Sequence, residues 1–274
     1  MGDVIRSPTA SYAVVKPLGR TPTYSVYLVN DGTASDSWYM LKVSADALGN
    51  GRLDREALIL KDIQAEVERL RSTEKVGVSE GALRYEKCFP RLRESFLLKE
   101  QGSRRVNIIE IPDTDAVGSL VPIEQWRTRE RVRIDPKSSA WLLGRLFKVF
   151  TLTHPIGIGV GKIDGGNILV NPKKHRAIFF DWTEAHQYEQ FVPPEKVGEE
   201  IAQAATQVFL ALGGNVSTGV LPESDQLPDT RYVDLLREFI SGAERDPDKA
   251  AQRFYKLVRE MWDKEFHPFT TIPM

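Results

Sequence analysis

Apolar and polar residues alternate in short runs over the first part of the chain. The runs are SYAVVKPLG, SVYLVND and DSWYMLKVSAD, and turn-forming residues separate them. Runs of this kind predict an antiparallel meander of strands. The later segment LRESFLLKEQGSRRVNIIEIP predicts a hairpin, with Gly102 in its turn.

The spacing of the apolar residues changes once within this strand-rich part, in the segment GRLDREALILKDIQAEVERLRS. Its apolar residues recur at steps of three or four, so one face of a helix would be apolar. The residues on that face are Leu53, Ala57, Leu60, Ile63, Val67 and Leu70.

The second part of the chain has mainly helical periodicity. Asp135 and Asp246 each precede a proline, and a capping residue before proline predicts the start of a helix. The segment EEIAQAATQVFLALGG predicts a further helix that its two glycines end, and another helix would contain Tyr232 and Phe239. The polar segment PDTDAVGS, residues 112–119, is the expected boundary between the two parts.

Composition narrows the classes of partner. The chain has 37 basic and 38 acidic residues and a net charge of −1, so we expect neither nucleic acid nor a membrane as its partner. A single cysteine, Cys88, excludes an intrachain disulfide framework and a cysteine-rich zinc site, and favours a cytoplasmic protein. No apolar run approaches the about 20 residues that span a bilayer.

Four polar residues next to apolar elements are candidates for chemistry. Lys42 interrupts the apolar strand YMLKV, and Glu56 lies near the start of the predicted helix. Each alone is more readily explained as a solvent-exposed side chain, but together they could form an ion pair that directs the lysine at phosphates. Asn167 precedes one strand of a predicted hairpin and Asp181 ends the other. Their oxygens suit Mg²⁺, although each alone is an ordinary turn residue.

The order and spacing of these residues resemble the protein kinase superfamily. MLKVS resembles the third-strand lysine motif, LDREALILK the C-helix with its paired glutamate, and VNIIEIP the fifth strand and hinge. THPIGIGVGKIDGGNILV is similar, without a gap, to the family pattern LHxxGIxHxDLxxxNILV. IFFDW resembles the metal-binding Asp-Phe-Gly strand end. VPPEK resembles the Ala-Pro-Glu motif, and the helix after it has Glu200 in place of the usual aspartate.

The resemblance implies an α+β, two-lobed protein kinase-like fold, with an antiparallel β-sheet N-lobe over residues 1–112 and a mainly helical C-lobe over 113–274. It also implies ATP and Mg²⁺ as cofactors. Nucleotide-binding residues would be Lys42, Glu56, Gly19 and Glu110, and Mg²⁺ ligands would be Asn167 and Asp181.

The catalytic loop departs from the family pattern. Lys162 stands at the position of the aspartate that orients the acceptor hydroxyl, and an ammonium group only donates hydrogen bonds. Asp164 follows two residues later, where the family often has a lysine that contacts the γ-phosphate. The two charges therefore look exchanged, and Lys162 and Asp164 are the candidate catalytic residues.

The nucleotide-binding segments depart as well. LGRTPTYSVY keeps only Gly19 of the glycine-rich loop, with Thr21 and Tyr24 at the other glycine positions. Pro112 falls near the hinge position whose N–H meets adenine, and proline has no N–H. Trp182 replaces the phenylalanine that follows the metal-binding aspartate.

Three hypotheses follow. The first is a pseudokinase that acts by binding nucleotide or a protein partner. The second is an active, divergent ATP-dependent phosphotransferase, in which Asp164 orients a Ser/Thr protein or small-molecule acceptor and Lys162 holds the γ-phosphate. The third is a kinase-fold scaffold that no longer binds nucleotide, which a cleft blocked by Tyr24 or Trp182 would favour.

Overall fold

The chain forms two compact units in a computed structural model, which describes residues 4–32, 37–73, 85–99, 102–111, 120–222, 230–262 and 267–274. Unit 1 comprises Met1–Glu80, Phe89–Ser119 and Asp181–Ala185, and unit 2 comprises Gly81–Cys88, Leu120–Phe180 and His186–Met274. The expected boundary segment, 112–119, lies outside the described residues, and the division into 1–112 and 113–274 stays a prediction.

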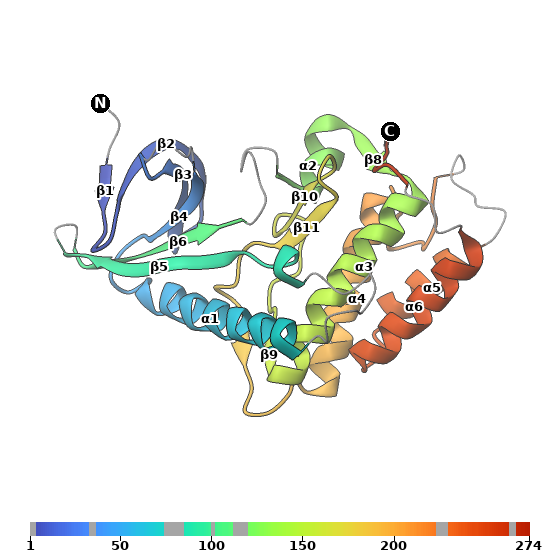
Figure 1. Ribbon diagram of the computed structural model, residues 1–274. Coiled ribbons are helices and arrows are strands. Elements are labelled where there is room, and N and C mark those ends of the chain that lie inside the picture. Colours follow the sequence, from blue (N-terminus) through green and yellow to red (C-terminus); the bar gives the residue numbers. More distant parts are fainter. Residues whose placement is uncertain are drawn as a thin grey trace. The chain divides into compact units, whose positions relative to one another are not determined.

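Unit 1 is a six-stranded antiparallel sheet with one long helix (Figure 1). The strand order is β1-β2-β3-β4-β6-β5. The elements are β1 (Val4–Arg6), β2 (Ser11–Arg20), β3 (Tyr24–Asn30), β4 (Trp38–Ser44), α1 (Asn50–Thr73), β5 (Arg91–Leu98) and β6 (Arg104–Glu110).

The meander, the helix and the hairpin predicted for this part are confirmed. Strands β2, β3 and β4 pair in sequence order, and β5 pairs with β6. Gly102 lies in the turn before β6 with a φ of 75°, a left-handed conformation that glycine adopts without strain. Strand β1 was not predicted, because three residues are too few to show an alternating pattern.

The sheet curls until its two edges approach each other. Glu94 on the edge strand β5 accepts hydrogen bonds from Ser7 (2.9 Å) and Thr9 (2.8 Å), which lie in the turn after the opposite edge strand, β1. The Tyr12 hydroxyl on β2 donates to the same carboxylate. One face of the curled sheet packs into a core that includes Val29, Leu41, Val43, Phe96, Val106 and Ile108.

Helix α1 packs on strands β4, β5 and β6. Strand β4 is therefore buried on both faces from Tyr39 to Ser44. Because side chains alternate along a strand, Leu41 and Val43 enter the core while Lys42 points to the other face. The buried face of α1 includes Leu53, Ala57, Leu60 and Ile63, as the spacing predicted, and also Glu56.

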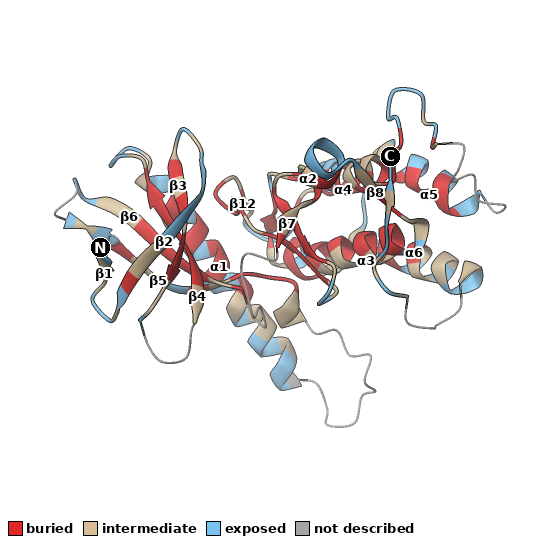
Figure 2. Ribbon diagram, turned by 90° about the horizontal axis from the view of Figure 1, so that it is seen from above, coloured by how far each residue is buried: buried red, intermediate tan, exposed pale blue. Residues whose placement is uncertain are grey.

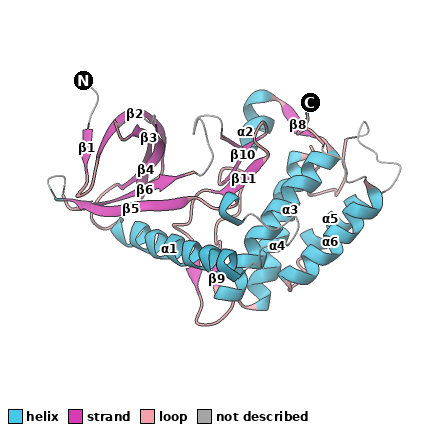
Figure 3. Ribbon diagram, in the orientation of Figure 1, coloured by secondary structure: helices cyan, strands magenta, loops and turns pink. Residues whose placement is uncertain are grey.

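Unit 2 is mainly helical, with small sheets (Figure 3). Its helices are η1 (Tyr85–Lys87), α2 (Ile123–Gln125), η4 (Trp126–Glu130), α3 (Pro136–Thr153), η5 (His154–Ile156), α4 (Pro194–Ala211), α5 (Arg231–Ile240) and α6 (Pro247–Met261). Its strands are β7 (Val121–Pro122), β8 (Val132–Ile134), β9 (Ile158–Gly159), β10 (Ile168–Asn171), β11 (Arg176–Phe179), β12 (His186–Gln187) and β13 (Thr271–Pro273).

The predicted helix starts are confirmed. Asp135 accepts hydrogen bonds from the first backbone N–H groups of α3, and Asp246 does the same for α6. Helix α4 begins earlier than its apolar period indicated, so Pro194 and Glu195 form its first turn. Strands β10 and β11 pair as the predicted hairpin. Figure 2 shows most of α3 as buried, and α4 buries one face that includes Ile201, Ala205 and Phe209.

Within the described ranges, none of the helices combines the length and the apolar composition that crossing a bilayer requires.

Candidate active site

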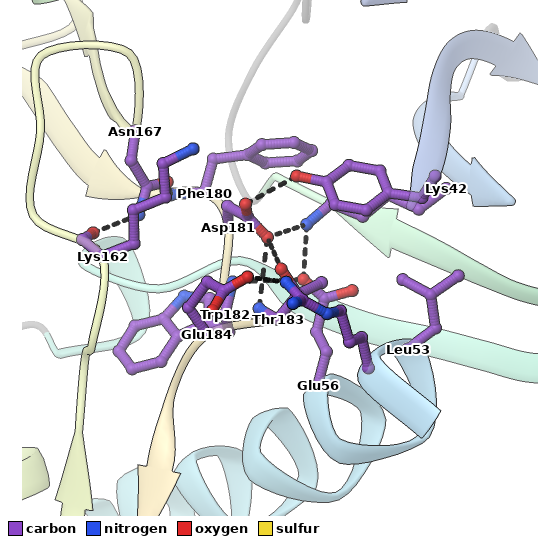
Figure 4. Close-up of polar contacts among 12 residues, drawn as sticks. Lys42, Leu53, Glu56, Lys162, Asn167, Phe180, Asp181, Trp182, Thr183 and Glu184 are labelled. Atoms are coloured by element: carbon purple, nitrogen blue, oxygen red, sulfur yellow. Dashed lines mark hydrogen bonds and ion pairs between the residues drawn. The ribbon is translucent and has the colours of Figure 1, made fainter. Parts of the chain in front are cut away.

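A fully buried lysine lies between two carboxylates in unit 1 (Figure 4). Lys42 Nζ lies 2.5 Å from Glu56 Oε1 and 3.0 Å from Asp181 Oδ1. Strand β4 supplies the lysine, helix α1 supplies Glu56, and Asp181 begins the segment Asp181–Ala185. The structure thus brings together three of the residues that the sequence singled out, and their side chains are 0%, 0% and 8% exposed.

Asp181 has protein donors on both of its oxygens. Oδ1 accepts hydrogen bonds from Lys42 Nζ, from the Thr183 backbone N–H (3.2 Å) and from the Thr183 hydroxyl (2.8 Å). Oδ2 accepts a hydrogen bond of 2.6 Å from the Tyr24 hydroxyl. A cation that coordinated this carboxylate would compete with these donors.

Tyr24 contacts both Lys42 and Asp181. It is buried in β3, and its ring centroid lies 5.0 Å from Lys42 Nζ, within range of a cation–π contact. The turn before β3 fixes its backbone, because the Tyr24 N–H donates to Thr21 Oγ1 and its carbonyl accepts from the Thr21 N–H. Thr21 and Tyr24 both stand at glycine positions in the family pattern. Thr21 fixes the backbone of Tyr24, and the Tyr24 hydroxyl contacts Asp181, the candidate metal ligand.

Asp181, Lys42 and Tyr24 shift one another's pKa values. Burial alone would raise the pKa of Asp181, but the charge of Lys42 and the hydrogen bonds from Tyr24 and Thr183 hold it well below its usual range. Burial likewise disfavours the charged form of Lys42, yet Glu56 and Asp181 keep its pKa above the usual value. Burial and the charge of Asp181 raise the pKa of Tyr24. At neutral pH Lys42 is therefore an ammonium, Asp181 a carboxylate and Tyr24 a neutral phenol.

Glu56 also accepts hydrogen bonds from Trp182 and from Asn107, and only Asn107 had no role assigned from the sequence. Its Oε2 accepts from Asn107 Nδ2 at 3.0 Å, and its Oε1 accepts from the Trp182 backbone N–H at 3.2 Å. Asn107 on β6 pairs in register with Lys42 on β4. The signal that could have found Asn107 is the one that found Lys42, a polar residue inside an apolar strand. Trp182 itself is fully buried and contacts Phe89.

The loop with the exchanged charges lies in unit 2. Lys162 Nζ and Asp164 Oδ2 are 3.7 Å apart, and the two side chains are 39% and 48% exposed. Asp164 Oδ1 also accepts the Asn167 backbone N–H at 2.8 Å, as a turn-capping aspartate does. Val160, at the family's histidine position, is fully buried.

Asn167 uses its side chain within unit 2. Its Nδ2 donates to the Lys162 carbonyl at 2.7 Å, and its Oδ1 accepts the Phe180 backbone N–H at 3.1 Å. The amide therefore fixes the loop that contains Lys162 against the end of the β10–β11 hairpin.

Helix α4 anchors the same loop from another direction. Glu200 accepts the Gly161 backbone N–H at 3.0 Å, and its other carboxylate oxygen lies 2.8 Å from His154 Nε2. His154 stacks on Phe150 at the end of α3 and is buried, as expected of a structural histidine.

Two further candidates for nucleotide binding lie on the sheet of unit 1. Gly19 is in β2 at an exposed position, where an added Cβ would meet no atom within 4 Å. Glu110 ends β6 and pairs in register with Arg91 on β5. Pro112, near the expected hinge, lies outside the described residues.

The residues that the sequence assigns to Mg²⁺ bind other protein groups. Both oxygens of Asp181 and both polar atoms of the Asn167 amide already engage protein groups. No cluster of three or more acidic, histidine or cysteine side chains suited to a metal occurs among the described residues. In unit 1, Mg²⁺ at Asp181 would therefore compete with Tyr24 and Lys42, and Lys42 is already paired with two carboxylates.

The curled antiparallel sheet with its long helix, together with the helical unit 2, defines a protein kinase-like fold. Comparison with solved structures gives the same result. A structure of vaccinia related kinase 3 matches with a TM-score of 0.62 and 12% sequence identity, over 95% of this chain and 91% of that chain. No family model and no curated protein sequence matches. At this identity the similarity shows the fold alone.

Proposed function

We propose that this chain is a pseudokinase whose phosphate and metal positions are closed by Tyr24, and that it acts by binding a protein partner. The observation that carries the proposal is the 2.6 Å hydrogen bond from the Tyr24 hydroxyl to Asp181. With this bond in place, Lys42 and Asp181 neutralise each other instead of phosphate and Mg²⁺. Nucleotide binds only after Tyr24 moves away.

The replacement of the catalytic aspartate supports the same proposal. Lys162 cannot accept a hydrogen bond from an acceptor hydroxyl. The nearest carboxylate along the loop, Asp164, instead caps the turn at Asn167 and faces Lys162. These contacts give Asp164 a structural role.

The proposal is tested by thermal unfolding with millimolar ATP, with and without Mg²⁺. We expect no magnesium-dependent stabilisation of the wild type, because ligands raise apparent stability only if they bind the folded state. The Tyr24→Ala variant should gain a magnesium-dependent shift, and Tyr24→Ala combined with Asp181→Asn should lose it. Tyr24→Phe is the matched variant, since it removes only the hydroxyl and leaves the ring over Lys42.

Either of two results would contradict the proposal. A magnesium-dependent shift in the wild type that Asp181→Asn abolishes would mean that Tyr24 does not close the site. If Tyr24→Ala and Tyr24→Phe both fold yet bind no nucleotide, Tyr24 is not what prevents binding, and a scaffold without any nucleotide site becomes the better description.

A second candidate function is the ATP-dependent phosphotransferase. The observation in its favour is that Asp164 and Lys162 are close together and about half exposed, so both charges can reach solvent. Phosphoryl transfer depends mainly on positioning and electrostatics, which an exchanged pair of charges could supply. In this reading an ATP-dependent transfer would require Asp164.

A further inference from the structure

Unit 2 contains a cavity of about 370 Å³ that the kinase-like site does not use. Helices α3 and α6 pack against each other along it (Figure 1). Gly144 on α3 allows this approach, since an added Cβ would lie 3.2 Å from both the Phe254 ring and the Tyr255 hydroxyl. The volume falls within the range of pockets that hold small organic ligands, which is about 300–1,000 Å³.

One wall of the cavity carries positive charge. Lys137, Trp141, Arg145 and Lys148 all line it and follow one another on α3 at steps of four, four and three residues. Residues at this spacing share one face of a helix. This face of α3 therefore supplies the positive charge of the cavity lining.

The other walls are aromatic and apolar. Helix α6 contributes Phe254, Tyr255 and Val258, the residue after it contributes the Trp262 ring, and the segment near the C-terminus contributes Phe269. The Trp141 and Phe269 rings meet edge to face with centroids 5.5 Å apart. Rings that are fixed in this way offer a rigid, flat-sided surface.

His175 belongs to the aromatic walls rather than to the cationic one. Its Nε2 accepts the Phe269 backbone N–H at 3.1 Å, which requires that nitrogen to be unprotonated. Burial, Arg145 and His267 lower the pKa of His175, so its ring is neutral at pH 7. The other lining histidine, His267, is 3.1 Å from Asp135.

The cations on α3 face no acidic side chain from the described part of the cavity lining. Among its described lining residues there is no aspartate or glutamate. Arg145 lies over the Trp141 ring, with Cζ 5.6 Å from the centroid. Burial and then the charge of Arg145 lower the pKa of Lys148. Two like charges beside an apolar surface repel each other, and an anion bound between them would remove that repulsion.

We propose that this cavity binds a small organic anion with a flat aromatic body and one acidic group, with the body against the aromatic side chains of α6 and the acidic group at Arg145 and Lys148. Such a ligand would contact the aromatic side chains and pair with the cations of α3 at the same time. A neutral aromatic compound would leave the cations unpaired, and a small inorganic anion would leave the aromatic surface uncovered.

The test uses two probes that differ by one charge. Binding of 1-anilinonaphthalene-8-sulfonate and of uncharged N-phenyl-1-naphthylamine is measured by fluorescence titration at pH 7 and checked for one site per chain by calorimetry. We expect the sulfonate to bind the wild type at one site, at least about tenfold more tightly than the neutral probe, because a charge-assisted contact is worth that much or more.

Variants locate the site. Arg145→Gln with Lys148→Gln should weaken sulfonate binding at least about tenfold. The matched control, Lys256→Gln with Arg259→Gln, removes the same charge from exposed positions on α6 outside the cavity and should leave binding unchanged. Val258→Trp should weaken binding by filling the cavity without altering charge. Thermal unfolding of each variant confirms that it is folded.

Three results would overturn the proposal. They are equal binding of the two probes, equal weakening by the two double variants, and failure of the sulfonate to bind the wild type at submillimolar concentration. If the Arg145→Gln, Lys148→Gln variant does not fold, Val258→Trp and the comparison of the two probes decide the question alone.

Discussion

Lys42 is the residue on which the interior of unit 1 depends most. Its ammonium group is fully buried and has a carboxylate on either side. The cost of removing three charges from water is offset only while all of them remain paired. Loss of one partner leaves a buried charge without compensation, so the effect of a substitution here should far exceed that of a surface charge.

We expect Lys42→Met to lower the free energy of unfolding by about 3–5 kcal/mol at pH 7, as for other broken buried ion pairs. The exposed Lys61 on α1 is the matched control, and Lys61→Met should change stability by less than about 0.5 kcal/mol. Chemical denaturation measures both. A loss for Lys42→Met no larger than that for Lys61→Met would show that the pair contributes little.

The pH dependence of stability provides a second test. The pKa of Asp181 is lower in the folded chain than its ordinary value of 3.8. Its stabilising contribution is therefore complete above that value and is lost as the pH falls towards the folded pKa. We expect the stability difference between wild type and Asp181→Asn to narrow as the pH is lowered below about 5. Denaturant titrations from neutral to acidic pH measure it, and a constant difference would contradict the lowered pKa.

The elements of the fold show what local sequence determines. The spacing of apolar residues predicted helix α1 and the β2–β4 meander. The capping aspartates predicted where α3 and α6 begin. The two-residue strands β9 and β12 pair only because the surrounding chain holds them together. Helix α4 extends back to Pro194, because proline is well accommodated in a first turn and the apolar period begins later.

The two aspartate caps differ in what they hold. Asp135 caps α3 and also contacts His267, while Ser138 in the same turn accepts the Thr270 backbone N–H at 2.9 Å. Asp246 caps α6 by accepting the Asp248 and Lys249 backbone N–H groups of that helix. The first cap therefore ties the C-terminal segment to α3 as well as starting the helix.

Substitution of each cap should separate these roles. Asp135→Ala and Asp246→Ala should each lower the free energy of unfolding by about 1 kcal/mol, the usual value of an N-cap. Only Asp135→Ala should increase hydrogen exchange at the backbone N–H groups of this segment, at residues 270–272 and 274, which lies against β8, Ser138 and Arg131. Equal exchange in the two variants would mean that Asp135 acts on its helix alone.

At the scale of the whole molecule, the fold could be predicted and the state of the site could not. The kinase-like motifs are distributed along the chain in the order that the fold requires. The contact between Tyr24 and Asp181, in contrast, joins residues 157 positions apart. No local pattern specifies such a contact, and Tyr24 could be identified in the sequence only as a replaced glycine.

A measurement of phosphoryl transfer by the whole chain distinguishes the proposed pseudokinase from the alternative, an ATP-dependent phosphotransferase. With radiolabelled ATP, Mg²⁺ and a generic protein acceptor, we expect phosphoryl transfer to be no higher for the wild type than for Lys42→Met. Asp164→Ala should be equally inactive and should lose a turn cap and the contact with Lys162. Transfer by the wild type that disappears in both Lys42→Met and Asp164→Ala would instead establish the phosphotransferase.

The hydrogen bonds that meet on Glu56 have a kinetic consequence. This one carboxylate joins α1 to Lys42 on β4, to Asn107 on β6 and to the Trp182 backbone. If α1 moves away from the sheet, these contacts break together, because all of them depend on the position of the Glu56 side chain. The helix should therefore move between two discrete positions, with a barrier between them, rather than drift gradually. A ligand that favoured one of these positions would change the relative populations of both.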